Sequence, residues 1–266
     1  MIVKDQLGRK INITSTPRRI VCLVPSLTEL LVDLGLEDVI VGVTKFCVHP
    51  ENIRKDKVVV GGTKHIHLDK IKQLKPDIIL CNKEENTKEI VTSLEEYFPV
   101  HVSDINTIDE AYDCIRQYGE LFDVVESAST LIYAIETEKE EFLASTKNLS
   151  AKKVAYFIWK DPWIAVGSQT FIHHIMVIVK LDNSFGNLSR YPEVLLEDVK
   201  RDSDLDAVLL SSEPYPFKEK HKKELELFLE SKPVILVDGE YFSWYGSRLK
   251  DAFNYFKELR LRLEQR

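Results

Sequence analysis

Three histidines in one stretch of the sequence have the chemistry to bind a metal. His49 stands in one loop, and His65 and His67 flank a single residue further along the chain. On an extended segment, residues two apart point to the same side, so His65 and His67 could act together with His49 as a third ligand. Imidazole nitrogens suit a transition metal or an axial position of a metal-containing ligand. Loop histidines are more often simply solvated, and that alternative stays open.

Aromatic side chains outside the predicted strands and helices form a second group with binding chemistry. Core aromatics normally lie within strands and helices, so a high density in loops predicts walls for a large flat or hydrophobic ligand. Packing of these rings on their own lobe is the alternative. The group comprises Phe46, Trp159, Trp163, Tyr191, Tyr215, Phe217, Tyr241, Phe242, Trp244 and Tyr245.

The sequence lacks the common catalytic and nucleotide-binding motifs. It contains no G-x-G-x-x-G after a strand, no G-x-x-x-x-G-K, no G-x-S-x-G and no H-E-x-x-H. We therefore expect a binding protein without catalytic residues of its own and without an intrinsic cofactor. The alternative is an enzyme acting on a tetrapyrrole or a nucleotide, for which the polar set Glu240, Ser243, Ser247 and Arg248 is the best support.

Strands and helices alternate along the chain, which predicts mostly parallel sheets covered on both faces. Apolar runs at 20–24, 39–43, 78–81 and 100–102 indicate strands of a first lobe. The pattern restarts with strands at 153–158, 205–210 and 234–237. Pro99 and Pro233, each opening a strand, are 134 residues apart, as are Arg19 and Lys153. The chain therefore repeats one supersecondary order, and two lobes with a ligand cleft between them are expected.

A long helical stretch separates the two copies. Residues 108–147 contain no proline and only one glycine, and their apolar residues follow helical spacing. We predict two helices divided near residues 121–123, the second about 22 residues and roughly 33 Å long. The fold class is α/β, with lobes at residues 1–122 and 149–266 and a single long connecting helix within 123–148.

Composition narrows the class of protein further. The formal net charge of −7 argues against a generic partner of nucleic acid or of an anionic membrane. No apolar stretch is long enough for a transmembrane helix. Cys22 and Cys81 lie in apolar runs and are expected to be buried thiols.

In their order along the chain, several short segments resemble the substrate-binding proteins of ABC importers for vitamin B12, iron–siderophores and haem. This resemblance implies two lobes joined by a helical backbone (a class III periplasmic-binding-protein-like fold), a monomer, and ABC import of a metal chelate, cobalamin first and otherwise a ferric siderophore or haem. The cobalamin-binding members are the most similar. The segments that carry the resemblance are 17–21, 25–30, 41–44, 60–63, 68–71, 74–77, 191–194 and 196–199.

The resemblance also implies roles for residues at matching positions. Phe46 matches an aromatic residue that contacts the corrin, His49 begins a segment that matches a tyrosine-proline loop, and Tyr191 falls near an aromatic residue of the second lobe. The stretch 240–248 matches a loop with acidic and basic ligand contacts. The candidate ligand-binding residues are Phe46, His49, His65, Trp163, Tyr191, Glu240, Tyr241, Trp244 and Arg248; the candidate metal ligands are His49, His65 and His67.

The resemblance further implies contacts with a membrane permease. Asp69 and Glu197 match one acidic residue on each lobe that docks onto permease arginines, and they are 128 residues apart, in corresponding places of the two copies. Asp69 has a shorter reach than the glutamate usual there, and a tryptophan expected near Gly61-Gly62 is missing. The family implies a periplasmic or membrane-associated protein. The sequence shows neither signal peptide nor lipidation cysteine, so a cytoplasmic protein is expected if the chain is complete.

Overall fold

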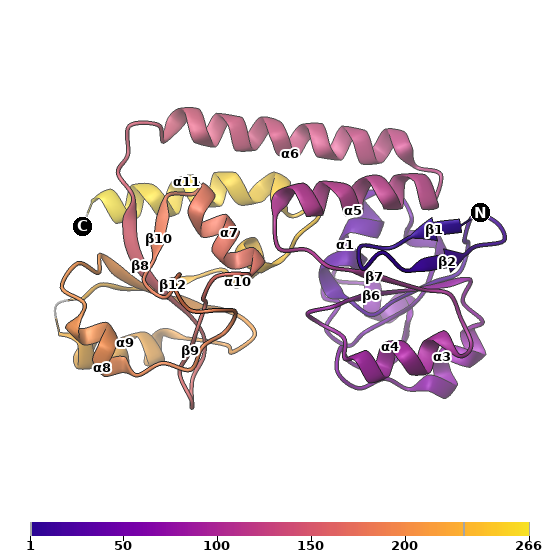
Figure 1. The fold of residues 1–266 in the computed structure, drawn as a ribbon, viewed down its shortest axis with the longest axis horizontal. Coiled ribbons are helices and arrows are strands. Elements are labelled where there is room, and N and C mark those ends of the chain that lie inside the picture. Colours follow the sequence, from indigo (N-terminus) through magenta and orange to yellow (C-terminus); the bar gives the residue numbers. More distant parts are fainter. Residues whose placement is uncertain (1, 231, 266) are drawn as a thin grey trace. The chain divides into compact units, whose positions relative to one another are not determined.

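The computed structural model describes residues 2–230 and 232–265, which divide into two compact units. The first comprises residues 1–105, 109–135 and 245–248, and the second comprises 106–108, 136–244 and 249–266. Both units are α/β (Figure 1). This confirms the predicted fold class of two α/β lobes with parallel sheets. Residues 245–248, close to the end of the chain, belong to the first unit.

The first unit is built on a five-stranded parallel sheet with the order β5-β4-β3-β6-β7. Helices α3 and α4 lie on one side of this sheet, and α1 and α5 lie on the other (Figure 1). The strands are β3 (Ile20–Cys22), β4 (Ile40–Val43), β5 (Val58–Val59), β6 (Ile78–Asn82) and β7 (Val100–Ser103). The helices are α1 (Pro25–Asp33), the 3-10 turn η1 (Glu37–Val39), α2 (Ile53–Asp56), α3 (Leu68–Leu74), α4 (Lys88–Glu95) and α5 (Ile108–Leu121).

Apolar strands explain why this sheet is buried on both faces. Val21, Leu23, Ile79 and Cys81 are fully buried in one cluster, which α3 and α4 cover. Residues at alternate strand positions, such as Cys22, point to the opposite face and are equally buried. All four cysteines are free and buried, as expected for Cys22 and Cys81.

The starts of two helices in the first unit show which local signals were informative. Helix α4 begins where Thr87 accepts a hydrogen bond from the backbone N–H of Ile90 at 3.3 Å, an ordinary N-cap. Helix α1 begins with Pro25 and has no side-chain cap. Neither Ser26 nor Thr28, the hydroxyl residues of its first turn, caps this helix. The Thr28 hydroxyl instead donates to the Val24 carbonyl at 3.0 Å, from within the helix.

A short antiparallel hairpin of β1 (Ile2–Lys4) and β2 (Lys10–Asn12), which the sequence did not reveal, precedes the main sheet. Side chains of its connecting turn satisfy the outer backbone groups of the edge strand β7. Arg9 Nη2 donates to the Val100 carbonyl at 3.2 Å, and the Val102 N–H donates to Asp5 at 3.2 Å. Unpaired edge groups are a template for unwanted strand pairing. The hairpin thus closes this edge with side chains instead of a sixth strand.

The second unit repeats the plan with a sheet of order β10-β8-β11-β12, parallel except for β9, which pairs antiparallel with β8. As in the first unit, the opening strand is central and the last two strands lie to one side of it. The strands are β8 (Lys152–Trp159), β9 (Ile164–Ala165), β10 (Leu181–Asn183), β11 (Ala207–Ser211) and β12 (Val234–Val237). The helices are α7 (Phe171–Ile178), α8 (Leu196–Arg201), α9 (Glu219–Leu229), α10 (Gly239–Ser243) and α11 (Leu249–Glu264).

The predicted long helix between the two copies is confirmed. Helix α6 (Val125–Ser145) has 21 residues and follows α5 after a break at residues 122–124. Residues up to Ile135 belong to the first unit and residues from Glu136 onward to the second.

Candidate ligand-binding site

The carboxyl edge of the first sheet is where a ligand is expected on topological grounds. From β3 the chain builds β4 and β5 on one side and then β6 and β7 on the other. Ligands of open parallel sheets bind where the strand order reverses in this way, outside the carboxyl ends of the strands. At this edge the loops after β3, β4, β5 and β6 meet; for example, the Asn86 amide donates to the Thr63 carbonyl at 2.9 Å.

Phe46 is an exposed candidate residue at this edge. It follows β4 and is 49% exposed. Its ring lies over Gly62, because a Cβ placed on Gly62 would be 3.1 Å from Phe46 Cε2. The Lys45 ammonium lies 5.0 Å from the centroid of the same ring. A glycine under the ring and a cation beside it form a small aromatic platform.

Two further cations and a half-buried acid, Glu85, lie in the adjoining loops. Arg54 Nη1 donates to the Lys45 carbonyl at 3.1 Å, and Lys64 Nζ donates to the Glu84 carbonyl at 2.8 Å. Burial raises the pKa of the Glu85 carboxyl, while the nearby Lys64 ammonium acts in the opposite direction. The loops at this edge therefore carry charges of both signs: Lys45, Arg54 and Lys64 are exposed, and so are the acids Glu51 and Glu84.

The structure does not bring the three candidate metal ligands together into a metal site. Among residues 2–230 and 232–265, no group of three or more His, Cys, Asp or Glu is arranged to hold a metal ion. His65 and His67 are exposed, and His49 is half-buried. Their backbones are constrained, since Gly62 N–H donates to the His65 carbonyl and His67 N–H to the Val60 carbonyl. His65 and His67 are thus exposed residues of the turn and are not part of a metal-binding group.

Arg248, another candidate for ligand contact, is already engaged within the first unit. Its guanidinium forms a bidentate ion pair with Glu29 of α1, with distances of 3.0 Å from Nε and 2.6 Å from Nη2. Burial raises the pKa of Glu29, and Arg248 opposes that shift. Gly246, with a φ of +122°, lets this segment approach Leu30, because a Cβ there would lie 3.3 Å from Leu30 Cβ. Residues 245–248 therefore hold α1 in place.

The carboxyl edge of the second sheet carries more aromatic residues, but they contact one another. Trp163 stacks on Phe217 with centroids 5.8 Å apart and meets the edge of Phe157 at 5.1 Å. Trp159 lies against Tyr215 at 5.5 Å. Trp163 therefore packs on aromatic residues of its own lobe, which was the alternative given for loop aromatics.

Helix α10 and the residues that flank it are held by a carboxylate that the sequence analysis did not select. Glu213 is the second residue after β11 and accepts hydrogen bonds from the Ser243 hydroxyl and, at 3.0 Å, from the Trp244 indole N–H. Trp244 is only 8% exposed. The available signal was the position of Glu213 just beyond a buried apolar strand, where parallel sheets place functional side chains.

The remaining candidates of the second unit are partly covered. Tyr241 stacks on Tyr255 of α11 with centroids 4.7 Å apart. Tyr191 and Glu240 are half-buried, and the Arg190 guanidinium lies 5.7 Å from the Tyr191 ring centroid. Burial raises the pKa of Tyr255 to about 12, so its phenol stays protonated and accepts from the Asp238 N–H at 2.8 Å. These side chains are therefore held in place by contacts within the second unit.

The two candidate docking acids occupy equivalent places in the units. Asp69 is the second residue of α3, and Glu197 is the second residue of α8. Both side chains are exposed, and among the described residues neither forms an ion pair. Carboxylates in the first turn are favoured by the helix dipole, which is the ordinary reason for acids at these positions.

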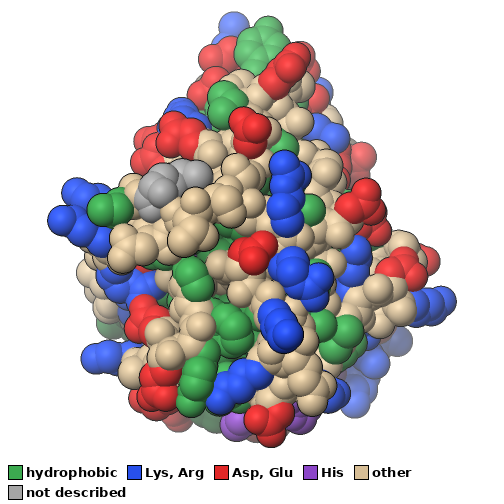
Figure 2. Space-filling view, turned by 90° about the vertical axis from the view of Figure 1, so that its right-hand side faces the viewer, with side chains coloured by type: hydrophobic (Ala, Val, Ile, Leu, Met, Phe, Trp, Pro, Cys, Tyr) green, Lys and Arg blue, Asp and Glu red, His purple; other side chains and the backbone are tan. Residues whose placement is uncertain are grey.

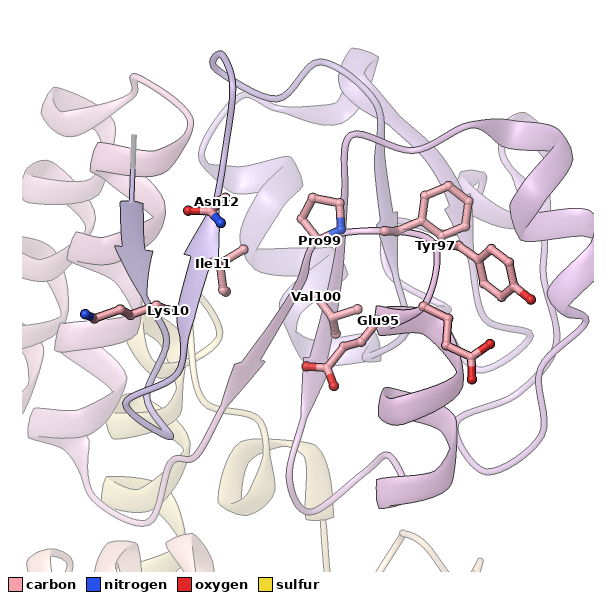
Figure 3. A pocket seen from close by; sticks show the side chains of 9 residues that line it. Lys10, Ile11, Asn12, Glu95, Tyr97, Pro99 and Val100 are labelled. Atoms are coloured by element: carbon pink, nitrogen blue, oxygen red, sulfur yellow. The ribbon is translucent and has the colours of Figure 1, made fainter.

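A separate pocket lies at the opposite, amino edge of the first sheet. Its volume is about 420 Å³, and it is formed by the end of the hairpin and the loop before β7 (Figure 3). Figure 2, which views the molecule from the side of this hairpin, shows a group of Lys and Arg side chains near the centre, with acidic and hydrophobic side chains among them. None of the candidate ligand residues lines this pocket; its lining is Lys10, Ile11, Asn12, Glu95, Glu96, Tyr97, Phe98, Pro99 and Val100.

Comparison with known proteins identifies the family. The family model described as "Periplasmic binding protein" matches residues 20–235, and the chain therefore belongs to this family. A haem-binding periplasmic protein of Pseudomonas aeruginosa has the same fold, with a TM-score of 0.79 and 19% identity over 91% of this chain and 92% of that chain. Many solved structures match in this way.

Two curated relatives show a similar degree of likeness in sequence. The uncharacterized ABC transporter substrate-binding lipoprotein YvrC of Bacillus subtilis (strain 168) is 26% identical over 190 residues, 68% of this chain and 60% of that protein. The vitamin B12-binding protein of Vibrio vulnificus (strain YJ016) is 28% identical over 183 residues, 68% of this chain and 67% of that protein. No described helix of the chain is long and apolar enough to cross a membrane.

Proposed function

We propose that this chain is the substrate-binding protein of an ABC importer and that it captures a metal chelate of the corrinoid, haem or ferric-siderophore type. The observation that carries the proposal is the half-exposed Phe46 ring on Gly62, at the switch point of the first sheet. Aromatic platforms of this kind bind flat or apolar faces of large ligands. The names of the relatives support the class of ligand, with vitamin B12 named most often.

The proposal is tested by titrating the purified protein with cyanocobalamin, haemin and a ferric siderophore, and binding is measured by calorimetry. One of the three is expected to bind with a dissociation constant in the micromolar range or below. Phe46→Ala is expected to weaken that binding by about tenfold, the loss of one buried aromatic contact. Tyr97→Ala is the matched control, because Tyr97 is 50% exposed and has a lysine ammonium 3.4 Å from its ring, but lies at the amino edge.

Two results would contradict this proposal. Absence of binding for all three ligands would remove the importer function. Equal weakening by Phe46→Ala and Tyr97→Ala would show that the Phe46 platform is not the ligand surface. A small effect of Tyr97→Ala beside a large effect of Phe46→Ala is the expected pattern.

We also propose that Asp69 and Glu197 dock the protein onto a permease, as the resemblance implies. Their equivalent, exposed positions at the starts of α3 and α8 support this role. Charge reversal of both residues is expected to reduce ligand uptake into cells carrying the importer and to leave ligand affinity unchanged. Unchanged uptake would leave these two residues as ordinary helix-start carboxylates.

A further inference from the structure

His221 is a buried histidine at the start of α9, in the second unit. It is the third residue of that helix and is only 7% exposed. Its Nδ1 atom accepts a hydrogen bond from the Lys218 N–H at 3.0 Å. In a capping box, a glutamate or glutamine at this position accepts the same bond. His221 therefore closes the end of α9 with a side chain that can take up a proton near neutral pH.

The hydrogen bond from Lys218 fixes the protonation state of the His221 ring. A neutral imidazole has one nitrogen that donates and one that accepts, whereas an imidazolium has two donors. Because Nδ1 accepts, the proton is on Nε2, which lies 3.4 Å from the Tyr215 hydroxyl oxygen. A second proton would bind at Nδ1 and would place two N–H groups against each other. Protonation of His221 therefore breaks the cap of α9.

The charged groups around His221 oppose a positive ring. Lys218 and Lys220 lie at the start of α9, and Lys160 lies in the loop between β8 and β9. Burial lowers the pKa of His221, the three lysine charges lower it further, and Glu224 acts in the opposite direction. Glu224 is itself paired with Lys160 at 2.6 Å. The neutral ring is therefore favoured until the pH falls below the ordinary histidine pKa of about 6.5.

The His221 ring also supports the aromatic side chains of the loop after β11. It meets Tyr215 and Phe217 edge to face, with centroid distances of 5.4 Å and 5.7 Å. Tyr215 lies against Trp159 at 5.5 Å, and Phe217 stacks on Trp163 at 5.8 Å. Trp159 is the last residue of β8 and is 38% exposed. His221 is therefore one ring away from Trp159 and from Trp163 at the carboxyl edge of the second sheet.

We propose that His221 is a positioning residue: its neutral ring holds Tyr215 and Phe217 in place, and its protonation in mild acid loosens the aromatic carboxyl edge of the second unit. Because folding favours the neutral ring, the stabilisation is present above a pH of about 6.5 and is lost as the pH falls through the lower pKa of the folded state. The consequence for binding rests on the proposed function. A chelate that contacts this edge would bind more weakly in acid, because only molecules with an ordered edge can bind it.

The first test uses the unchanged protein without ligand. Nitrogen-15 NMR of the histidine rings reports which nitrogen carries the proton and at which pH the second proton binds. For His221 we expect the proton on Nε2 at a pH of about 7.5 and a midpoint below about 6.5. A proton on Nδ1, or a midpoint at or above this value, would overturn the proposal.

Matched variants then connect His221 to the aromatic residues. His221→Gln keeps an acceptor for the Lys218 N–H but does not titrate in this range. Tryptophan fluorescence of the wild type is expected to change reversibly between a pH of about 7.5 and about 5, with the NMR midpoint, and that of His221→Gln is expected to stay constant. An equal transition in His221→Gln would overturn the proposal.

His173→Gln is the control for the loss of a histidine. His173 lies in the same unit, its Nδ1 is 3.1 Å from the Asn183 amide nitrogen, and burial lowers its pKa as well. This variant is expected to keep the wild-type transition, and loss of the transition would overturn the assignment to His221. Circular dichroism checks that both variants are folded, and the NMR test decides the question if His221→Gln is not.

The last measurement concerns the ligand. The chelate that binds best to the wild type is titrated by calorimetry at a pH of about 7.5 and of about 5. The wild-type affinity is expected to fall at least about threefold more than that of His221→Gln, and the comparison cancels titration of the chelate itself. Equal losses would overturn the effect of His221 on binding. Failure of every chelate to bind would overturn the importer function alone, because NMR and fluorescence decide the role of His221 without a ligand.

Discussion

The carboxyl edges of the two sheets are built from similar residues but differ in how far their side chains are already engaged. In the first unit Phe46 is 49% exposed, and the Lys45 ammonium lies 5.0 Å from its ring centroid. In the second unit Trp163 stacks on Phe217, and Glu213 holds the indole of Trp244. The first edge therefore presents an exposed aromatic ring, whereas Trp163 and Trp244 of the second edge contact other side chains of their own unit.

This difference shows how loop aromatics should be judged. An aromatic residue in a loop binds a ligand only if its own unit leaves the ring uncovered. Trp163, Tyr241 and Trp244 all have partners from their own unit: Phe217, Tyr255 and Glu213 respectively. Phe46, which is 49% exposed, meets this condition.

The largest test of this comparison exchanges one aromatic residue at each edge for alanine. Trp163→Ala removes a ring packed against Phe157 and Phe217 and is expected to lower the free energy of unfolding by about 3 kcal/mol. Phe46→Ala, at an exposed ring, is expected to change it by less than about 0.5 kcal/mol. Urea denaturation followed by circular dichroism measures both. Similar losses for the two variants would show that the edges do not differ in this way.

A smaller effect is expected at the ion pair that holds residues 245–248 in the first unit. The side chains of Arg248 and Glu29 are only 12% and 18% exposed. Arg248→Met leaves a partly buried carboxylate uncompensated, and we expect a loss of about 2 kcal/mol at pH 7. Lys160→Met is the control from the second unit: its partner Glu224 lies at the same 2.6 Å but is 63% exposed, so a loss below about 0.5 kcal/mol is expected.

The pH dependence of the Arg248→Met deficit gives a second readout. The pKa of Glu29 is raised by burial even with Arg248 present. Without Arg248 it rises further, so folding favours the protonated carboxyl and stability falls as pH increases from the unfolded-state pKa of about 4.5 through the folded-state pKa. The deficit should therefore be largest at pH 7 and shrink toward pH 4.5. A deficit independent of pH would mean that Arg248 acts through packing alone.

Sequence reasoning was most successful for features that repeat or extend over many residues. Helix α6, the break before it and the two parallel sheets follow from periodicity and from prolines at strand starts. The hairpin β1–β2 was missed, because strands of three residues carry too little alternation to be recognised. Hydroxyl residues near a helix start are an unreliable signal here, because α1 begins at Pro25 and neither Ser26 nor Thr28 caps it.

Parts of the candidate site were beyond the reach of the sequence, because contacts between distant loops decide them. The pairing of Arg248 with Glu29 joins residues 219 positions apart. The stacking of Tyr241 on Tyr255 and the role of Glu213 depend likewise on tertiary packing. Which residue types occupy the edges could be predicted; which of them remain uncovered could not.

The return of residues 245–248 to the first unit has a consequence for how this chain is made. Tyr245 is buried there, near Ser26 and Ser103, and Arg248 pairs with Glu29. On the ribosome, the amino-terminal half can therefore complete its fold only after residue 248 of 266 has emerged, when the second sheet is already synthesised. A cut within α6 would give an amino-terminal fragment that lacks a piece of its own interior.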